Sequence, residues 1–250
     1  MKLAFTSRPF AGADSRPTPE VLIDTSVNTL IVAVPWGSRD AAKKVIDRRL
    51  EYLSFAAQDR EATSPLPRMS CLSTAANNLR TAAMLANDML YREDNGDEYR
   101  AGVELFAATL SQNELSWVQV GGPHILLGRG SQALLPIGSS VDLALDLSLD
   151  QAARSRLPAL PAQLLGLDSN VNLTINSFRA RPHDSLVLLS HSRTPESLFS
   201  WKSNIIDPDR MVQTLSQNDA HTAFWLGVMS IKGDASDLSA ASFELNGDVA

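Results

Sequence analysis

The amino-acid sequence predicts an α+β domain built as a four-layer α/β/β/α sandwich, in which helices flank two antiparallel sheets. Three observations support this class: two long amphipathic helices follow the first strands, short strands separated by turns fill the middle of the chain, and further strands close its end. With 250 residues, of which 44% are hydrophobic and 20% charged, the chain has the size of one large domain with a sizeable core.

The first half of the chain is expected to contain one buried strand and two helices. An apolar run rich in β-branched side chains (NTLIVAV) ends at Pro35. The next segment repeats apolar side chains every three to four residues, with Arg49 as the one polar residue on that face, and an alanine-rich segment follows a proline-containing break. The expected elements are a strand at 28–34 and helices at 39–60 and 72–90.

From residue 102 onward, short strands dominate. Apolar runs such as GVELFAATL and LSWVQVG alternate with turn residues, which predicts an antiparallel meander as far as residue 137. Trp117 in the meander, like Trp36 after the first strand, is expected to be a core aromatic. The remaining expected elements are an irregular connection with a short helix at 151–170, strands at 171–178, 184–190 and 221–231, and short helices at 195–201 and 207–216.

The composition excludes several classes of protein. The net charge is −6 and lysine and arginine are not clustered, which argues against a nucleic-acid binder. The single cysteine, Cys71, allows neither an internal disulfide nor a cysteine-rich zinc site. No apolar stretch approaches the ~18 residues of a membrane span, and the start of the chain lacks a secretory core. We therefore expect a cytoplasmic protein that binds neither nucleic acid nor a membrane.

Five short segments form a further pattern along the chain. They are 16–21 (RPTPEV), 32–39 (VAVPWGSR), 113–127 (NELSWVQVGGPHILL), 183–192 (HDSLVLLSHS) and 219–222 (DAHT). In this order they resemble the Arg-x-x-Asn-Glu-Asp, Val-Ala-Asp-Gly, Gly-Asp-Ser-Arg hairpin, Ser-Asp-Gly and Asp-Asn-x-Thr motifs of the metal-dependent protein serine/threonine phosphatases, called type 2C or PPM. The resemblance implies one phosphatase-like domain over residues 1–231, followed by an acidic polar tail at 232–250.

The resemblance also implies a catalytic centre with two divalent ions, and this sequence departs from it at the metal ligands. Such ions, Mg²⁺ or Mn²⁺, need carboxylate oxygens and activate a bridging water. Val34 stands where the family has the aspartate that bridges both ions, and Pro35 stands at the glycine beside it. His191 replaces the aspartate of Ser-Asp-Gly, and Val21 replaces that of Asn-Glu-Asp. The bridged metal pair is therefore expected to be lost.

Three polar residues still match the family's motifs. Arg16 corresponds to the arginine that contacts substrate phosphate, and Glu20 and Asp219 are carboxylates at the edges of the former metal site. Ordinary surface charges are an equally open interpretation of all three. No metal or other cofactor is expected, with Glu20 and Asp219 as the only weak candidates for metal ligands. The expected vestigial site consists of Arg16, Glu20, Val34, Pro35, His191 and Asp219.

Three functional hypotheses follow from these residues. The first is a catalytically impaired phosphatase-like protein, or pseudophosphatase, that binds a protein partner in phosphorylation signalling, such as a phosphoprotein or a kinase-linked protein. The second is an active phosphatase that holds Mg²⁺ or Mn²⁺ through other residues, for example Asp40 or Asp184. The third is an accidental resemblance in a different α+β protein.

Overall fold

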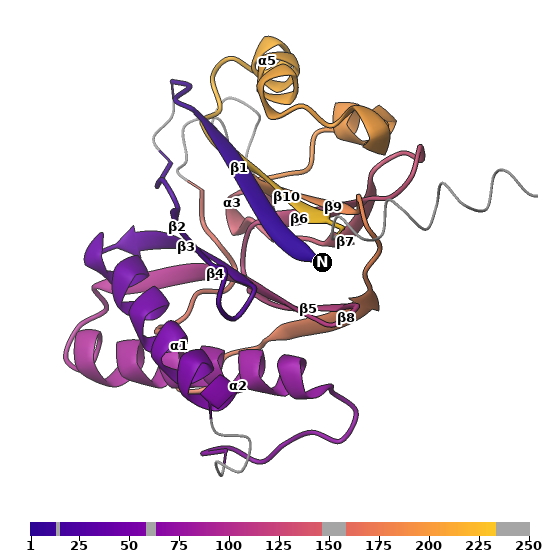
Figure 1. The fold of residues 1–250 in the computed structure, drawn as a ribbon. Helices are drawn as coiled ribbons and strands as arrows, with labels where there is room; N and C mark the ends of the chain where they lie inside the picture. The colour runs from indigo at the N-terminus through magenta and orange to yellow at the C-terminus, as the bar shows by residue number, and fades with distance from the viewer. Residues whose placement is uncertain (14–15, 59–63, 147–158, 234–250) are drawn as a thin grey trace, which may run out of the picture.

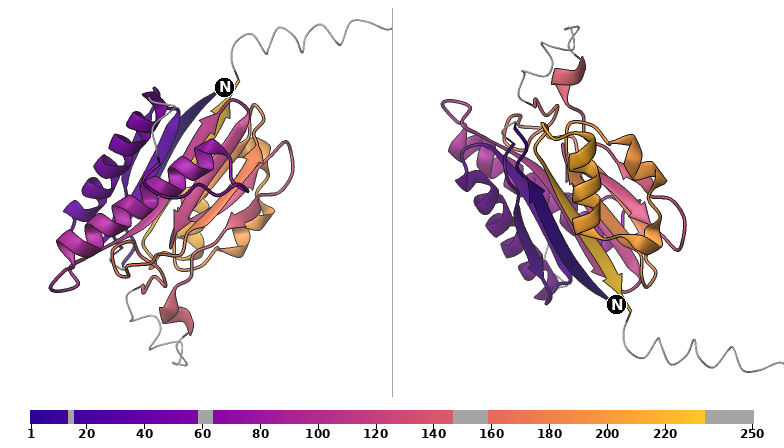
Figure 2. Two further views of the ribbon diagram at one scale, coloured as in Figure 1. Left: turned by 90° about the horizontal axis from the view of Figure 1, so that it is seen from below. Right: turned by 90° about the horizontal axis from the view of Figure 1, so that it is seen from above.

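The computed structural model describes residues 1–13, 16–58, 64–146 and 159–233. Two five-stranded antiparallel sheets stack face to face, and helices cover their outer faces (Figures 1 and 2). The predicted α+β sandwich of two antiparallel sheets is therefore confirmed. No helix within these described ranges is long and apolar enough to cross a membrane.

The first sheet, which we call the β3–β4 sheet, has the strand order β2-β3-β4-β5-β8. Its outer face is covered by the two long helices predicted from the sequence. The strands are β2 (Glu20–Asp24), β3 (Thr29–Gly37), β4 (Ala101–Ser111), β5 (Glu114–Val120) and β8 (Thr174–Arg179), and the helices are α1 (Asp40–Gln58) and α2 (Thr74–Met89).

The second sheet, which we call the β9–β10 sheet, has the order β1-β10-β9-β6-β7. The helix α5 (Pro208–Asn218) lies on the outer side of its strands β1 and β10. The strands are β1 (Lys2–Phe10), β6 (His124–Gly128), β7 (Leu135–Gly138), β9 (Ser185–Ser190) and β10 (Phe224–Lys232). The remaining helical elements are η1 (Leu90–Asp94), α3 (Leu143–Asp146), η2 (Glu196–Ser200), η3 (Ser203–Ile205) and α5 (Pro208–Asn218).

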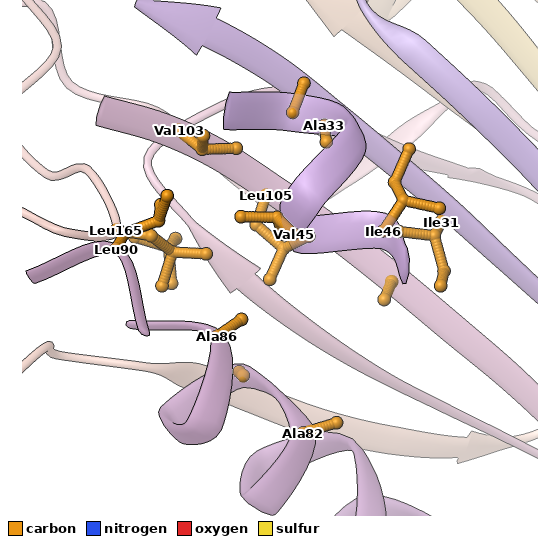
Figure 3. Close-up of a cluster of buried hydrophobic side chains, with 14 of the residues drawn as sticks. Ile31, Ala33, Val45, Ile46, Ala82, Ala86, Leu90, Val103, Leu105 and Leu165 are labelled. Atoms are coloured by element: carbon orange, nitrogen blue, oxygen red, sulfur yellow. The ribbon is translucent and has the colours of Figure 1, made fainter. Parts of the chain in front are cut away.

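The continuous apolar run in β3 is explained by burial on both faces of the strand. Ile31 and Ala33 point toward α1 and α2 and join the cluster shown in Figure 3. Leu30 and Val32 point the other way, into the space between the two sheets, which we call the interlayer space. A strand covered on both sides has no need for polar residues, so the sequence does not alternate.

Packing of α2 depends on its small residues and its cap. Ser73 precedes the helix, and its hydroxyl oxygen accepts a hydrogen bond from the backbone N–H of Ala76 at 3.3 Å, which satisfies one donor of the first turn. Ala82, Ala83 and Ala86 are fully buried against the β3–β4 sheet and α1. Alanine side chains allow the helix to lie close to its neighbours.

One expectation for the second half needs correction. The predicted meander is split between the sheets, because β4 and β5 belong to the β3–β4 sheet whereas β6 and β7 belong to the other. The chain crosses at Gly121–Pro123, where Gly121 has a φ of +64°, a conformation that glycine adopts without steric cost. Of the irregular connection with a short helix expected at 151–170, residues 159–170 are irregular and contain no helix, and residues 151–158, like most of the expected tail, lie outside the described residues.

The first two strands were not expected from the sequence. The segment Lys2–Phe10 contains Arg8 and Pro9 and has no regular alternation, yet it pairs along its full length with β10. It is an edge strand of the β9–β10 sheet, where a proline removes no ladder hydrogen bond that the sheet needs. Pairing with a strand more than two hundred residues away determines its conformation.

Candidate functional site

Arg16 connects the two sheets at one end of the interlayer space. Its Nε–H donates to the hydroxyl of Ser190 at 3.1 Å, and its Nη1 donates to the hydroxyl of Ser192 at 3.3 Å. Its Cζ lies 6.0 Å from the centroid of the Trp36 ring, within the range of a cation–π contact. Because Trp36 is the penultimate residue of β3 and Ser190 is the last residue of β9, one side chain spans both sheets. We call Arg16, Trp36, Ser190 and Ser192 the Arg16 cluster.

Burial governs the electrostatics of this cluster. Desolvation lowers the pKa of Arg16, while the negative charges of Glu104 and Asp142 act in the opposite direction. Asp142 is buried, and its Oδ1 accepts the N–H groups of Ala144 and Leu160, each at 2.9 Å. The guanidinium therefore lies in a partly dry environment with two carboxylates nearby.

Glu104 is a functional candidate that the sequence did not reveal. It is 2% exposed and lies on β4, directly opposite Val34 on β3. The Trp36 Nε1–H donates to Oε2 at 3.1 Å and the Gly122 N–H donates to Oε1 at 2.8 Å. Burial raises the pKa of Glu104, although the charge of Arg16 and these two hydrogen bonds oppose that rise.

Val34 and Pro35 continue the regular β3 ladder at the position where the resemblance places a metal-binding loop. Val34 pairs with Glu104 and Pro35 pairs with Val103, and both β3 residues are buried. Alternation places Val34 on the face of Val32, toward the interlayer space. An isopropyl group at that point offers no donor atom to a cation.

His191 follows β9 immediately and is 8% exposed. Its Nδ1 accepts the N–H of Arg193 at 3.1 Å, and desolvation lowers its pKa. Its carbonyl oxygen accepts a hydrogen bond at 3.0 Å from Nε2 of His124, whose Nδ1 accepts the Ser140 N–H at 3.3 Å. These partners require neutral His124 with its proton on Nε2, and burial lowers the pKa of His124 to about 4.

Asp219 lies within electrostatic reach of His191, but its carboxylate oxygens accept hydrogen bonds from the turn that follows it. Oδ1 accepts the N–H groups of His221 and Thr222 at 3.0 and 3.1 Å, and Oδ2 accepts the Thr222 hydroxyl at 2.6 Å. The Thr222 hydroxyl is the main cause of the lowered pKa of Asp219, to which the charge of His191 adds. The carboxylate is exposed and stays ionised in this geometry.

The other carboxylates named from the sequence lie elsewhere. Glu20 is exposed and pairs with Ala33, whose side chain faces the helices, so Glu20 lies on the opposite face of the sheet from Val34. Asp184 precedes β9, at the end remote from His191, where both of its oxygens accept hydrogen bonds from Arg129. Asp40 is exposed at the first turn of α1. Of the predicted site, Arg16 and Asp219 both lie within electrostatic reach of His191. Val34 lies opposite Glu104, whose charge acts on Arg16.

The donor set does not fit a pair of bridged divalent ions. Among the residues that the structure describes, no three histidine, cysteine, aspartate or glutamate side chains are grouped so that they could hold a metal ion. The nearest buried carboxylate, Glu104, already accepts one hydrogen bond on each oxygen, and the guanidinium of Arg16 adds a positive charge beside it. Hard divalent ions require several oxygen ligands, which these side chains do not supply.

Known proteins resemble this chain in fold. No protein-family model matches the chain. No curated protein matches it either. Solved structures match over nearly their full length, at identities that show likeness in fold alone.

Three of these structures illustrate the likeness. The serine/threonine phosphatase PstP/Ppp of Mycobacterium tuberculosis is 16% identical, with a TM-score of 0.63 over 93% of this chain and 100% of that one. PppA of Pseudomonas aeruginosa, described as a key regulatory component of T6SS, is 17% identical, with 0.62 over 92% and 98%. The PPM phosphatase MsPP of Mycobacterium smegmatis, in complex with cacodylate, is 19% identical, with 0.62 over 93% and 99%. The chain therefore has the fold of the PPM-type serine/threonine phosphatases, as the resemblance predicted.

Proposed function

We propose that this chain is a phosphatase-like binding protein, a pseudophosphatase that recognises a phosphorylated protein without hydrolysing its phosphate. The observation that carries the proposal is the combination of Arg16, held between the two sheets, with Val34 at the position of the bridging aspartate. Arg16 provides a positive charge that can bind a phosphate group. Val34 removes a metal ligand that hydrolysis of the phosphate ester would require.

Arginine is well suited to bind a phosphate group. Its planar guanidinium offers several N–H donors and forms charge-assisted hydrogen bonds with phosphate oxygens. The hydroxyl groups of Ser190 and Ser192, which accept from Arg16, also carry protons that can be donated to an anion. We infer that a phosphoserine or phosphothreonine side chain of a partner, a phosphoprotein or a kinase-linked protein, is the ligand.

Loss of hydrolysis follows from the chemistry of the family. A bridged ion pair supplies the activated water and stabilises the leaving oxygen. With Val34, Pro35 and His191 in place of the ligands, we propose that the chain functions without a metal pair. Isothermal titration with Mn²⁺ and with Mg²⁺ tests this, and two-site binding at micromolar affinity would contradict the proposal.

Binding of the phosphorylated ligand needs a separate measurement. A set of phosphoserine and phosphothreonine peptides and their unphosphorylated forms should be titrated against the wild type and Arg16→Ala. We expect phosphate-dependent binding that Arg16→Ala abolishes. Equal affinity for phosphorylated and unphosphorylated peptides in the wild type would refute this function.

The alternative function is an active phosphatase with a rearranged metal site. Its support is the presence of two buried carboxylates, Glu104 and Asp142, within electrostatic reach of Arg16. An assay with p-nitrophenyl phosphate and Mn²⁺ distinguishes the two. Turnover that is lost in Asp219→Ala would favour the alternative, and the absence of turnover across a range of Mn²⁺ concentrations favours the binding protein.

A further inference from the structure

The carboxylate of Glu104 lies beside the Arg16 cluster, although the ligand proposed for that cluster is negatively charged. A buried carboxylate near an anion site repels the anion by its charge. Glu104 is 2% exposed and cannot contact a ligand freely from its position on β4. Its position therefore requires a role other than direct contact with the anion.

The hydrogen bonds of Glu104 fix its carboxylate tightly. Gly122 donates its N–H to Oε1 at 2.8 Å, and a Cβ on Gly122 would lie only 2.7 Å from the same oxygen. The turn between β5 and β6 thus closes over the carboxylate with no room for a side chain. Trp36 donates its Nε1–H to the other oxygen at 3.1 Å. The carboxylate therefore holds the indole ring to β4.

The indole in turn supports the guanidinium. Cζ of Arg16 lies 6.0 Å from the Trp36 ring centroid, and the charge of Glu104 attracts Arg16 toward the same side. The contacts form a continuous chain from the Gly122 N–H through Glu104 and Trp36 to Arg16. We propose that Glu104 is a positioning residue for the Arg16 cluster. Glu104 holds the Trp36 indole, and through the indole it holds the Arg16 guanidinium in the orientation that binds an anion. The inference rests on the proposed function.

Glu104→Gln tests the inference because loss of the negative charge and loss of the positioning role predict opposite changes in the affinity for an anion. Removal of the negative charge alone would strengthen anion binding. Loss of positioning weakens it, because the amide cannot accept both hydrogen bonds through oxygen and its NH₂ group opposes one of the two donors. We expect binding of inorganic phosphate and phenyl phosphate, followed by NMR, to weaken about tenfold, as for the loss of one hydrogen bond to a charged group.

Two further variants separate positioning from general stability. Trp36→Phe keeps a ring under Arg16 but removes the N–H donor, so it should weaken phosphate binding as Glu104→Gln does. The double variant of Trp36→Phe with Glu104→Gln should bind phosphate at least as tightly as the single variant with the lower affinity, because both substitutions break the same hydrogen bond. Asp184→Asn is the matched control, since Asp184 is as buried as Glu104 but lies before β9, at the strand end away from the cluster. It should lower stability and leave phosphate affinity unchanged.

A readout without ligand keeps the inference testable by itself. In the wild type, the Nε–H signal of Arg16 should carry a ring-current shift from Trp36, and Glu104→Gln should reduce that shift. An unchanged Arg16 signal, or phosphate affinity in Glu104→Gln equal to or above that of the wild type, would overturn the inference. A wild type that binds no phosphate refutes the proposed function, and the Arg16 signal alone then decides whether Glu104 positions it.

Discussion

Val34 and Glu104 lie directly opposite each other on β3 and β4. Alternation along the strands places both side chains on the face of Val32 and Phe106, toward the interlayer space. Directly opposed residues of an antiparallel pair have Cβ atoms about 4.5–5.5 Å apart. The site therefore has its buried carboxylate one strand away from the position where the family has its bridging aspartate. Because Val34 is uncharged, Glu104 has no second carboxylate directly opposite it on β3.

Val34→Asp should destabilise the protein in the absence of metal. The new carboxylate would be buried opposite Glu104, so that desolvation and like-charge repulsion add, and we expect a loss of about 3 kcal/mol in the free energy of unfolding. Urea denaturation measures this. Val34→Asn is the matched control, since it introduces a polar group without charge and should cost less.

The pair Val34→Asp with Glu104→Gln checks the cause of this loss. If repulsion between the two carboxylates contributes, the double variant should be more stable than the sum of the two single effects predicts. Strict additivity would show that desolvation of the aspartate accounts for the whole effect.

Arg49→Met should stabilise the protein. Arg49 on α1 is fully buried, and its Nε and both terminal nitrogens have no hydrogen-bond partner among the described residues. Burial lowers the pKa of Arg49 to about 9. Methionine fills similar space without a charge, so we expect a gain of about 1–3 kcal/mol in the free energy of unfolding, measured with urea.

The neighbouring Arg48 provides the control for this substitution. Its side chain is 43% exposed and pairs with Glu51 at 2.8 Å on the helix surface. Arg48→Met should change stability by no more than about 0.5 kcal/mol. A loss of stability in Arg49→Met would mean that the guanidinium contributes more through packing than its burial costs.

Local sequence patterns predicted those helices and strands whose buried face can be recognised from their own apolar residues. The β3 strand and the helices α1 and α2 were predicted within a few residues, because β-branched runs and three-to-four-residue spacing report burial directly. The strands β1 and β2 were missed, since their conformation comes from pairing with β10 and β3. Local sequence carries little information about such distant pairing.

The same distinction applies to the site. Val34 and His191 were identified through the resemblance, because they stand within short motifs. Glu104 was missed, because its importance depends on the β3–β4 register and on the turn at Gly122, neither of which the sequence displays. The one available signal was a glutamate inside the apolar run GVELFAATL. Trp117 is a core aromatic as expected, at 2% exposure, whereas Trp36 is half-buried at the edge of the interlayer space.

The free energy of unfolding should decrease as the pH is lowered from about 6.5 to about 4, because protonation of His124 favours the unfolded chain. Its pKa is lowered to about 4 in the folded protein from 6.5 unfolded, so the unfolded chain binds more protons in this range and acid favours unfolding. The full contribution is present above pH 6.5 and amounts to at most about 3 kcal/mol.

Comparison of the wild type with His124→Gln isolates this contribution. Urea denaturation at several pH values should give a flatter curve for His124→Gln than for the wild type, whereas His221→Gln, at an exposed position, should reproduce the wild-type slope. Parallel curves for the wild type and His124→Gln would assign the acid sensitivity to other groups, such as His191.

Arg129→Met should destabilise the end of the sandwich opposite the Arg16 cluster. Arg129 donates to Asp184 through Nε at 2.9 Å and Nη2 at 2.6 Å, and the Asp184 side chain is only 3% exposed. Without Arg129 the carboxylate keeps the Arg181 N–H at 2.9 Å as its remaining donor, which leaves a buried charge without a counter-ion. We expect a loss of about 2–4 kcal/mol, measured by urea denaturation.

The double variant Arg129→Met with Asp184→Asn identifies the origin of that loss. Removal of the charge together with its partner should recover part of the stability lost in Arg129→Met, because an uncharged amide costs less to bury than a lone carboxylate. Arg129 also lies 5.4 Å from the Phe178 ring and donates to the Arg179 carbonyl at 3.0 Å, so recovery should be incomplete. A double variant less stable than Arg129→Met would show that the Asp184 carboxylate is held mainly by its backbone donor, and that Arg129 contributes through its contacts with β8.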